Sequence, residues 1–243
     1  MISPPYFPTG LLWLALGLII SLSINLASRR ISAATHRYAC LIYRVAIPYL
    51  SILTGAISPY LMGLSNIDWA TSLGIGAGLS FAVLLILALI NIALLNSQNR
   101  SSTTKSGVQI NLSIHAWPKR QLFNGAVWAL AEQFYWAFNR AAIWEFLLRA
   151  EPNMQVPAYH ALWITGLTAL PDTLMHTTDL QNRLGNVGIF IATSILFFFT
   201  HNFWLCAFLH LAMVAMLHTT SPGSSSSTHG TEHLHLARRE KAV

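Results

Sequence analysis

Charged side chains interrupt an otherwise apolar stretch near the middle of the chain. Residues 131–146 read AEQFYWAFNRAAIWEF, and they contain Glu132, Arg140 and Glu145 although the whole chain has only 8 acidic residues. An ionisable group at membrane depth costs about 2.5–3.5 kcal/mol even on a lenient scale, so such groups usually face the protein interior and mark functional sites. Glu132 lies deepest in the stretch and is therefore the first candidate for chemistry.

The other two charges have simpler interpretations. Glu145 and Arg149 are four residues apart in the favourable order, which predicts an ion pair at the end of the segment. Arg140 follows Glu132 by eight residues, or about 12 Å along a helix. These two side chains therefore cannot pair on a straight helix, and each needs a partner from another element.

The residues around Glu132 form a polar and aromatic stripe. On a helix, Glu132, Tyr135, Trp136 and Asn139 follow the i, i+3, i+4, i+7 spacing of a single face, and Trp128 extends that face by one turn. A stripe of this kind must face other helices or a water-filled cavity.

Few residues elsewhere could meet Glu132, and most of them are histidines. The candidates in the later segments are His160, Asp172, His176, His201, Asn202 and His210. Imidazole and carboxylate are ordinary zinc ligands, so a divalent metal such as zinc could bind here, with a glutamate as general base on bound water. Buried His and Asn can equally serve as hydrogen-bond links between helices. Both interpretations remain open on the sequence, and no metal is identified.

The composition of the chain predicts which kind of secondary structure must position these residues. The 243 residues are 54% hydrophobic and 9% charged, whereas soluble domains carry about 25% charged residues. We therefore predict an all-α, polytopic integral membrane helix bundle whose partner is the lipid bilayer. Runs long enough to cross it lie at 10–27, 45–64, 70–96, 121–148, 157–175 and 187–217.

The last run decides between six and seven transmembrane helices. Its 31 residues contain no Pro and no Gly after Gly188, so we expect one long helix, bent near His201–Asn202. A pair of short segments is the alternative. On one straight helix His201 faces away from His210, whereas Asn202 and His210 share a side.

The basic residues are spread between the runs, which predicts orientation and excludes a nucleic-acid footprint. Arg29, Arg30, Arg37 and Arg44 follow the first run, and a second basic group lies between the third and fourth. The positive-inside rule then places the N-terminus outside the cell membrane. Residues 1–218 form the predicted transmembrane domain, and the Ser/His-rich tail 219–243 is predicted to be disordered.

Three sequence motifs resemble those of the CAAX-protease and bacteriocin-processing (CPBP) family of intramembrane proteases. AEQFYWAFNRAA resembles the family's Glu-Glu-x-x-x-Arg helix, FFFTH fits Phe-x-x-x-His, and FWLCAFLHLAMV is similar to the setting of its third motif. The resemblance implies that Glu132 is the catalytic glutamate and that His201 and His210 help to hold the reacting water or a metal. Arg140, Asn202, Tyr135 and Asn139 would support them.

The resemblance implies a divergent intramembrane endopeptidase acting on a membrane-protein or peptide substrate, or a relative that has lost catalysis. The family's second glutamate is Gln133 here, and its final asparagine is Val214. A non-enzymatic membrane scaffold, which uses the polar stripe to bind partner helices, is the alternative. A small-solute transporter is a weaker one, because the chain has no clear internal repeat.

Overall fold

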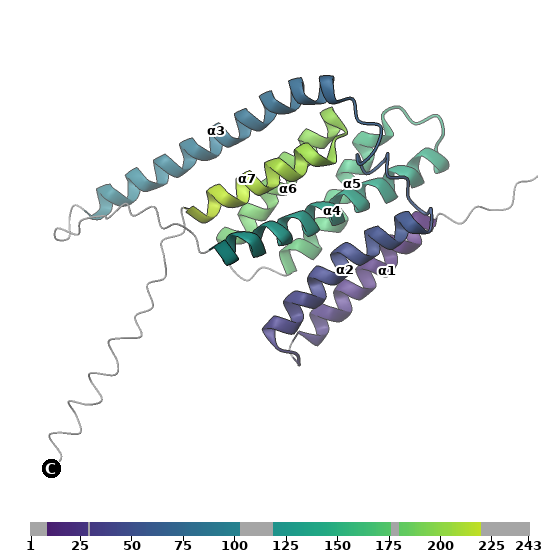
Figure 1. Cartoon of the computed structure of the whole chain (residues 1–243), viewed down its shortest axis with the longest axis horizontal. Helices are drawn as coiled ribbons and strands as arrows, with labels where there is room; N and C mark the ends of the chain where they lie inside the picture. Colours follow the sequence, from purple (N-terminus) through teal and green to yellow (C-terminus); the bar gives the residue numbers. More distant parts are fainter. Residues whose placement is uncertain (1–8, 29, 103–118, 176–179, 220–243) are drawn as a thin grey trace, which may run out of the picture.

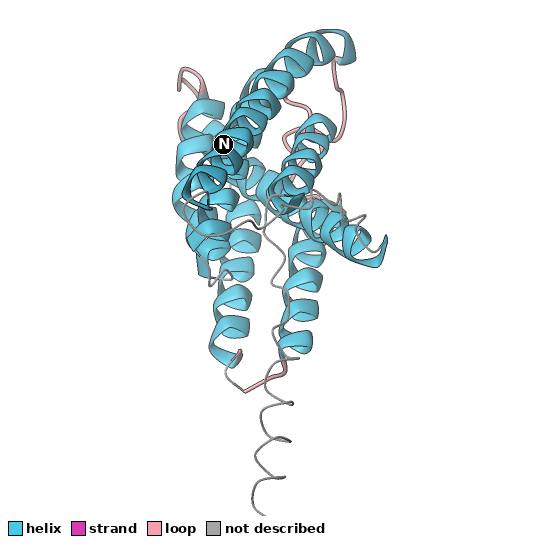
Figure 2. Ribbon diagram, turned by 90° about the vertical axis from the view of Figure 1, so that its left-hand side faces the viewer, coloured by secondary structure: helices cyan, strands magenta, loops and turns pink. Residues whose placement is uncertain are grey.

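The chain folds as an all-helical bundle of the membrane-protein type. The computed structural model describes residues 9–28, 30–102, 119–175 and 180–219, and over these residues it contains seven α-helices and no strand (Figures 1 and 2). The helices are α1 (Thr9–Ala27), α2 (Ala33–Leu53), α3 (Trp69–Ser102), α4 (Lys119–Ala150), α5 (Pro157–Met175), α6 (Leu180–Thr200) and α7 (Phe203–Thr219). The all-α membrane bundle is confirmed; the prediction was of six or seven transmembrane helices, and the described residues form seven helices in all.

Helix α4 forms the centre of the bundle. It packs against α1 and α2 on one side and against α5 and α7 on the other, while α6 joins α5 to α7. Helix α3 lies outermost, and among the described helices it contacts α6 and α7 alone (Figure 1). The side chains of α4 therefore meet most of the other helices, which explains why its polar residues are buried.

The membrane-spanning character is concentrated in a few helices. Among the described residues, Thr9–Ala27, Trp69–Ala93 and Arg183–Thr200 are long and apolar enough to cross a bilayer, and Phe203–Leu217 is a shorter apolar helix. The deep charged residues Arg44, Glu132 and Asp172 lie on α2, α4 and α5 instead. Of these three helices α4 is the central one, and the most apolar helix, α3, lies at the edge of the bundle.

The predicted second span at 45–64 is wrong in position. The helix begins after Ser32, whose hydroxyl accepts a hydrogen bond from the Thr35 amide at 3.1 Å, and it ends at Leu53. Pro48 lies inside this helix, and Pro59 lies in the following loop. The apolar run was displaced because residues 54–64 are apolar without being helical, and because the first turns of the helix are polar.

Residues 54–68 form a loop that packs into the bundle, where Ile57 and Met62 are almost fully buried. Gly63 has φ +73°, and its carbonyl accepts a hydrogen bond from the Phe203 amide at 3.0 Å. A Cβ at Gly63 would lie 2.7 Å from the His201 carbonyl oxygen. The loop therefore fits closely against the connection between α6 and α7.

The expected single helix over 187–217 is also wrong, and the alternative of two segments holds. The chain turns at His201, which has φ +46°, and α7 returns alongside α6. The Asn202 side chain accepts hydrogen bonds from the amides of Trp204 and Leu205 at 3.0 and 3.3 Å, which caps α7. The turn signal was thus a helix-capping asparagine and a left-handed histidine, not a glycine or proline.

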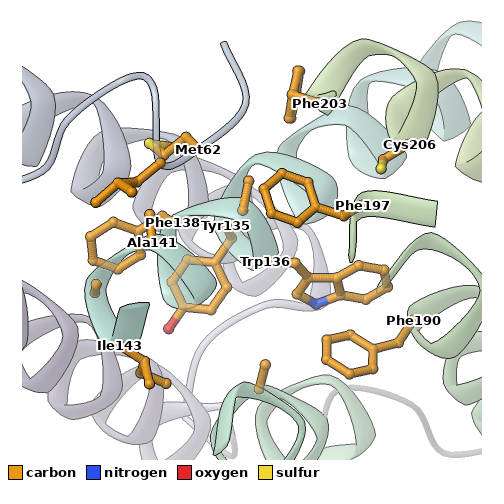
Figure 3. Close-up of a cluster of buried hydrophobic side chains, with 14 of the residues drawn as sticks. Met62, Tyr135, Trp136, Phe138, Ala141, Ile143, Phe190, Phe197, Phe203 and Cys206 are labelled. Carbon is orange, nitrogen blue, oxygen red and sulfur yellow. The ribbon is translucent and has the colours of Figure 1, made fainter. Parts of the chain in front are cut away.

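The apolar core surrounds α4. Trp136 of α4 lies beside Phe190 and Phe197 of α6, while Tyr135 and Phe138 fill the other side of the core (Figure 3). The Trp136 and Phe190 rings meet edge to face with centroids 5.0 Å apart. These aromatic contacts hold the polar face of α4 against the rest of the bundle.

Candidate functional site

Glu132 meets an arginine from α2 inside the bundle. An Arg44 guanidinium nitrogen lies 3.1 Å from Glu132 Oε1, and a second one lies 3.4 Å from Asp172 Oδ2 of α5. Arg44, Glu132 and Asp172 retain only 1%, 4% and 5% of their surface exposed. One cation thus joins two carboxylates from three helices at a depth where unpaired charges are costly. We call Arg44, Glu132 and Asp172 the charge cluster.

Two hydroxyl groups also donate to Asp172. The Tyr43 hydroxyl donates to Asp172 Oδ2 at 2.9 Å, and the Ser21 hydroxyl of α1 also donates to this carboxylate. The charge cluster holds two carboxylates and one guanidinium, so these donors stabilise the additional negative charge. They also bring α1 into contact with the cluster.

The aromatic stripe of α4 packs against the side of Arg44 opposite to the two carboxylates. The Arg44 guanidinium carbon lies 5.2 Å from the centroid of the Trp128 ring, within the range of a cation–π contact. Tyr135 is buried, and its ring meets Tyr43 edge to face at 5.5 Å. The predicted stripe therefore does face other helices, and those helices belong to the same chain.

Arg44 was not among the partners that the sequence suggested for Glu132, although Asp172 was. The sequence places Arg44 with the basic residues that predict orientation. Arg44 follows Arg37 by seven residues, which places it about 10.5 Å deeper along a helix that contains both. Because α2 begins at Ala33 and not near residue 45, Arg44 lies in the interior. Ser32, the residue at which α2 starts, was the sequence signal that could have predicted the interior position of Arg44.

His210 is buried near Glu132 on the neighbouring helix α7. Its ring stacks on Trp136, one turn beyond Glu132, with centroids 5.1 Å apart and an interplanar angle of 11°. Its Nδ1 atom has no hydrogen-bond partner among the described residues. His210 thus packs against the aromatic stripe of α4, one helical turn from Glu132.

His201 lies apart from that face, at the turn between α6 and α7. Its ring packs beside Trp144 and Phe197, with centroids 5.3 and 5.7 Å away, and this desolvation lowers the pKa of the imidazole. Trp144 is twelve residues beyond Glu132 on α4, or about 18 Å along the axis. His201 and Glu132 are therefore not brought together. Asn202, next to it, caps α7.

Arg140 is a second buried arginine, and its surroundings differ from those of Arg44. One guanidinium nitrogen donates to the Ser194 hydroxyl at 3.3 Å, and the guanidinium carbon lies 4.5 Å from the Phe197 ring centroid. No ion pair with a described carboxylate accompanies these contacts. Asn139 is likewise buried on the inner side of α4.

The remaining candidates lie away from the charge cluster. Glu145 and Arg149 form the predicted ion pair, with the Arg149 side chain half exposed. His160 is exposed and packs edge to face against Tyr159. His176 and the predicted tail, apart from Thr219, lie outside the described residues.

The residues that could hold a metal do not gather at one point. Within the described ranges, no group of three or more His, Cys, Asp or Glu side chains has the geometry to hold a metal ion. Glu132 is joined to a guanidinium, which competes with any cation for its oxygens. The set Glu132, His201 and His210 therefore does not fit a zinc centre in this arrangement.

Comparison with known proteins adds no further assignment. No protein-family model matches the chain, and no curated protein or solved structure matches it.

Proposed function

We propose that this chain is a non-enzymatic membrane scaffold that binds transmembrane helices on the outer face of α3. The observation that carries the proposal is a ridge of small residues. Ala70, Gly74, Gly78 and Ala82 are spaced by four and are all exposed. We call these four residues the small-residue ridge. Such spacing lets two membrane helices approach closely.

The inner face of α3 is already used within the chain. The Ser72 hydroxyl donates to the Thr200 carbonyl at 3.0 Å, and a Cβ at Gly76 would lie 2.6 Å from a methyl group of Leu205. Positions two residues apart on a helix differ by about 200°, so the small-residue ridge faces away from α6 and α7. A Cβ added at Gly74 or Gly78 would have no described atom within 4 Å.

The polar interior supports a structural role. The stripe on α4 is buried by helices of the same chain, so partner helices cannot reach it as the sequence suggested. The charge cluster links α1, α2, α4 and α5 through side chains that are paired with one another. In this proposal the interior fixes the bundle, and recognition takes place on α3.

A second copy of the chain is the simplest partner. A two-fold axis along the membrane normal would bring two small-residue ridges together as parallel helices. We expect differently tagged copies, co-expressed and extracted in mild detergent, to co-purify. Gly78→Ile should reduce the amount of the second copy that co-purifies at least about fivefold, because over-packing costs about 1–3 kcal/mol.

The matched control is Gly125→Ile on α4, where a Cβ would also have no described atom within 4 Å. This variant should co-purify as the wild type does. Equal co-purification of the Gly78 variant and the wild type would contradict the role of the ridge. Absence of wild-type co-purification, both in detergent and in native-lipid discs, would contradict self-association.

A CPBP-like hydrolase is the second candidate, favoured by the position of His210 beside Trp136, one turn from Glu132. In that case Glu132 would activate water for attack on a peptide bond. We expect instead that wild type and Glu132→Gln leave a candidate membrane substrate equally uncleaved in reconstituted vesicles. Cleavage by the wild type alone would favour the hydrolase and contradict the scaffold proposal.

The finer localisation also remains a prediction. Arg30, Arg37 and Arg183 lie at the end of the bundle where α2, α4 and α6 begin (Figure 1). The positive-inside rule supports a cytoplasmic position for this end in the cell membrane, with the N-terminus outside. Seven helices would then place the end of α7 on the cytoplasmic side.

A further inference from the structure

A cavity opens between α2 and α4 near the N-terminal ends of both helices, which lie on the same side of the molecule (Figure 1). Its volume is about 220 Å³, several times the roughly 30 Å³ that one liquid water occupies. The lining residues are Ala34, Arg37, Tyr38, Leu41, Phe123, Asn124, Val127 and Trp128. This cavity is separate from the small-residue ridge, since α3 does not contribute to it.

The lining is amphipathic. Arg37 and Asn124 supply hydrogen-bond donors at exposed positions, while Leu41 and Val127 supply partly buried apolar surface. No ion pair joins Arg37 to a carboxylate among the described residues. The guanidinium is thus free to bind an anion, and a planar guanidinium recognises phosphate oxygens in pairs.

The cavity lies at an end of the helix bundle, which is where lipid headgroups surround a membrane-spanning protein. Arg37 lies about 10.5 Å closer to the end of α2 than Arg44, which is buried among the helices. Tyr38 and Trp128 flank the cavity, and such aromatic residues are enriched at membrane–water interfaces. The N-termini of two parallel helices add positive potential at the same level.

Trp128 separates this cavity from the charge cluster. One side of the residue lines the cavity, and its ring lies 5.2 Å from the Arg44 guanidinium carbon. An anion in the cavity would therefore meet Arg37 without displacing the carboxylates that already pair with Arg44.

We propose that this cavity binds the phosphate of an anionic phospholipid headgroup. The Arg37 guanidinium and the Asn124 amide hold the phosphate, and the glycerol and first acyl carbons lie against Tyr38, Leu41 and Trp128. A phospholipid fits this site better than a free phosphate because the apolar half of the lining has a partner only in the lipid. The excess of basic over acidic residues, a net charge of +6, also favours an anionic lipid.

The test uses the delipidated full chain in detergent, titrated with phosphatidylglycerol or phosphatidylcholine and observed by native mass spectrometry. We expect one phosphatidylglycerol to be retained at concentrations at least about tenfold below those needed for phosphatidylcholine. Arg37→Gln should remove this preference. Arg30→Gln, an exposed arginine that does not line the cavity, should keep it.

A second variant tests the cavity independently of charge. Ala34→Trp places a large side chain at the exposed rim and should abolish phosphatidylglycerol retention, while thermal unfolding of both variants stays at the wild-type temperature. Unchanged retention in Arg37→Gln or in Ala34→Trp would overturn the proposal. Complete competition by millimolar inorganic phosphate would overturn it too, because the site would then recognise the free anion.

Discussion

Replacing Arg44 with methionine is expected to lower the free energy of unfolding by about 3–5 kcal/mol, the cost of leaving buried charge unpaired. Methionine fills a similar volume but offers no hydrogen-bond donor. Glu132 would lose its 3.1 Å contact, and Asp172 would lose its contact with the guanidinium while it keeps the hydroxyl groups of Tyr43 and Ser21. The measurement is equilibrium unfolding in mixed detergent micelles, followed by circular dichroism.

Two other arginines serve as controls. Arg149→Met removes a half-exposed ion pair and should cost less than about 1 kcal/mol. Arg140→Met removes a buried arginine that has no carboxylate partner among the described residues, so its effect should be about 1 kcal/mol or less in either direction. If Arg44→Met costs no more than Arg140→Met, burial alone and not pairing determines the effect.

Gly63→Ala is expected to be the second most harmful single change, with a loss of about 2–4 kcal/mol of unfolding free energy. The residue has φ +73°, and a Cβ would lie 2.7 Å from the His201 carbonyl oxygen and 2.9 Å from the Phe203 amide nitrogen. Both neighbours are backbone atoms, which cannot move aside as a flexible side chain can. The same unfolding measurement tests this variant.

Gly55→Ala separates the two causes of that loss. Gly55 has a similar φ of +70°, but a Cβ there would have no described atom within 4 Å. We expect this variant to lose only about 1 kcal/mol, the cost of the backbone conformation. Equal losses at Gly55 and Gly63 would show that the contact between the loop and the α6–α7 turn does not matter.

The helical membrane fold could be predicted because apolar length and low charge determine it. The bounds of individual helices were harder to predict where one apolar element follows another directly in the sequence. The run 187–217 carries no Gly or Pro at its turn, and only the capping side chain of Asn202 marks the point where the chain reverses. The run 45–64 combined the second half of α2 with a buried loop, because hydropathy does not distinguish the two.

The candidate site was predicted in part. The burial of Glu132 and the inward direction of its stripe follow from helical spacing, and both are confirmed. Its partner could not be found in this way, because the contact with Arg44 joins residues 88 positions apart and depends on the register of α2 against α4. Asp172 was recognised as a deep residue, but its role in sharing the arginine depends on the three-dimensional arrangement.

The central claim is that Glu132 acts as the structural partner of Arg44, and a double-mutant cycle tests it most directly. Arg44→Met, Glu132→Met and the double variant are unfolded under the same conditions in mixed micelles. We predict that the double variant is more stable than the sum of the two single losses implies, by about 1–3 kcal/mol. Additive losses, with a coupling below about 0.5 kcal/mol, would contradict this role for Glu132.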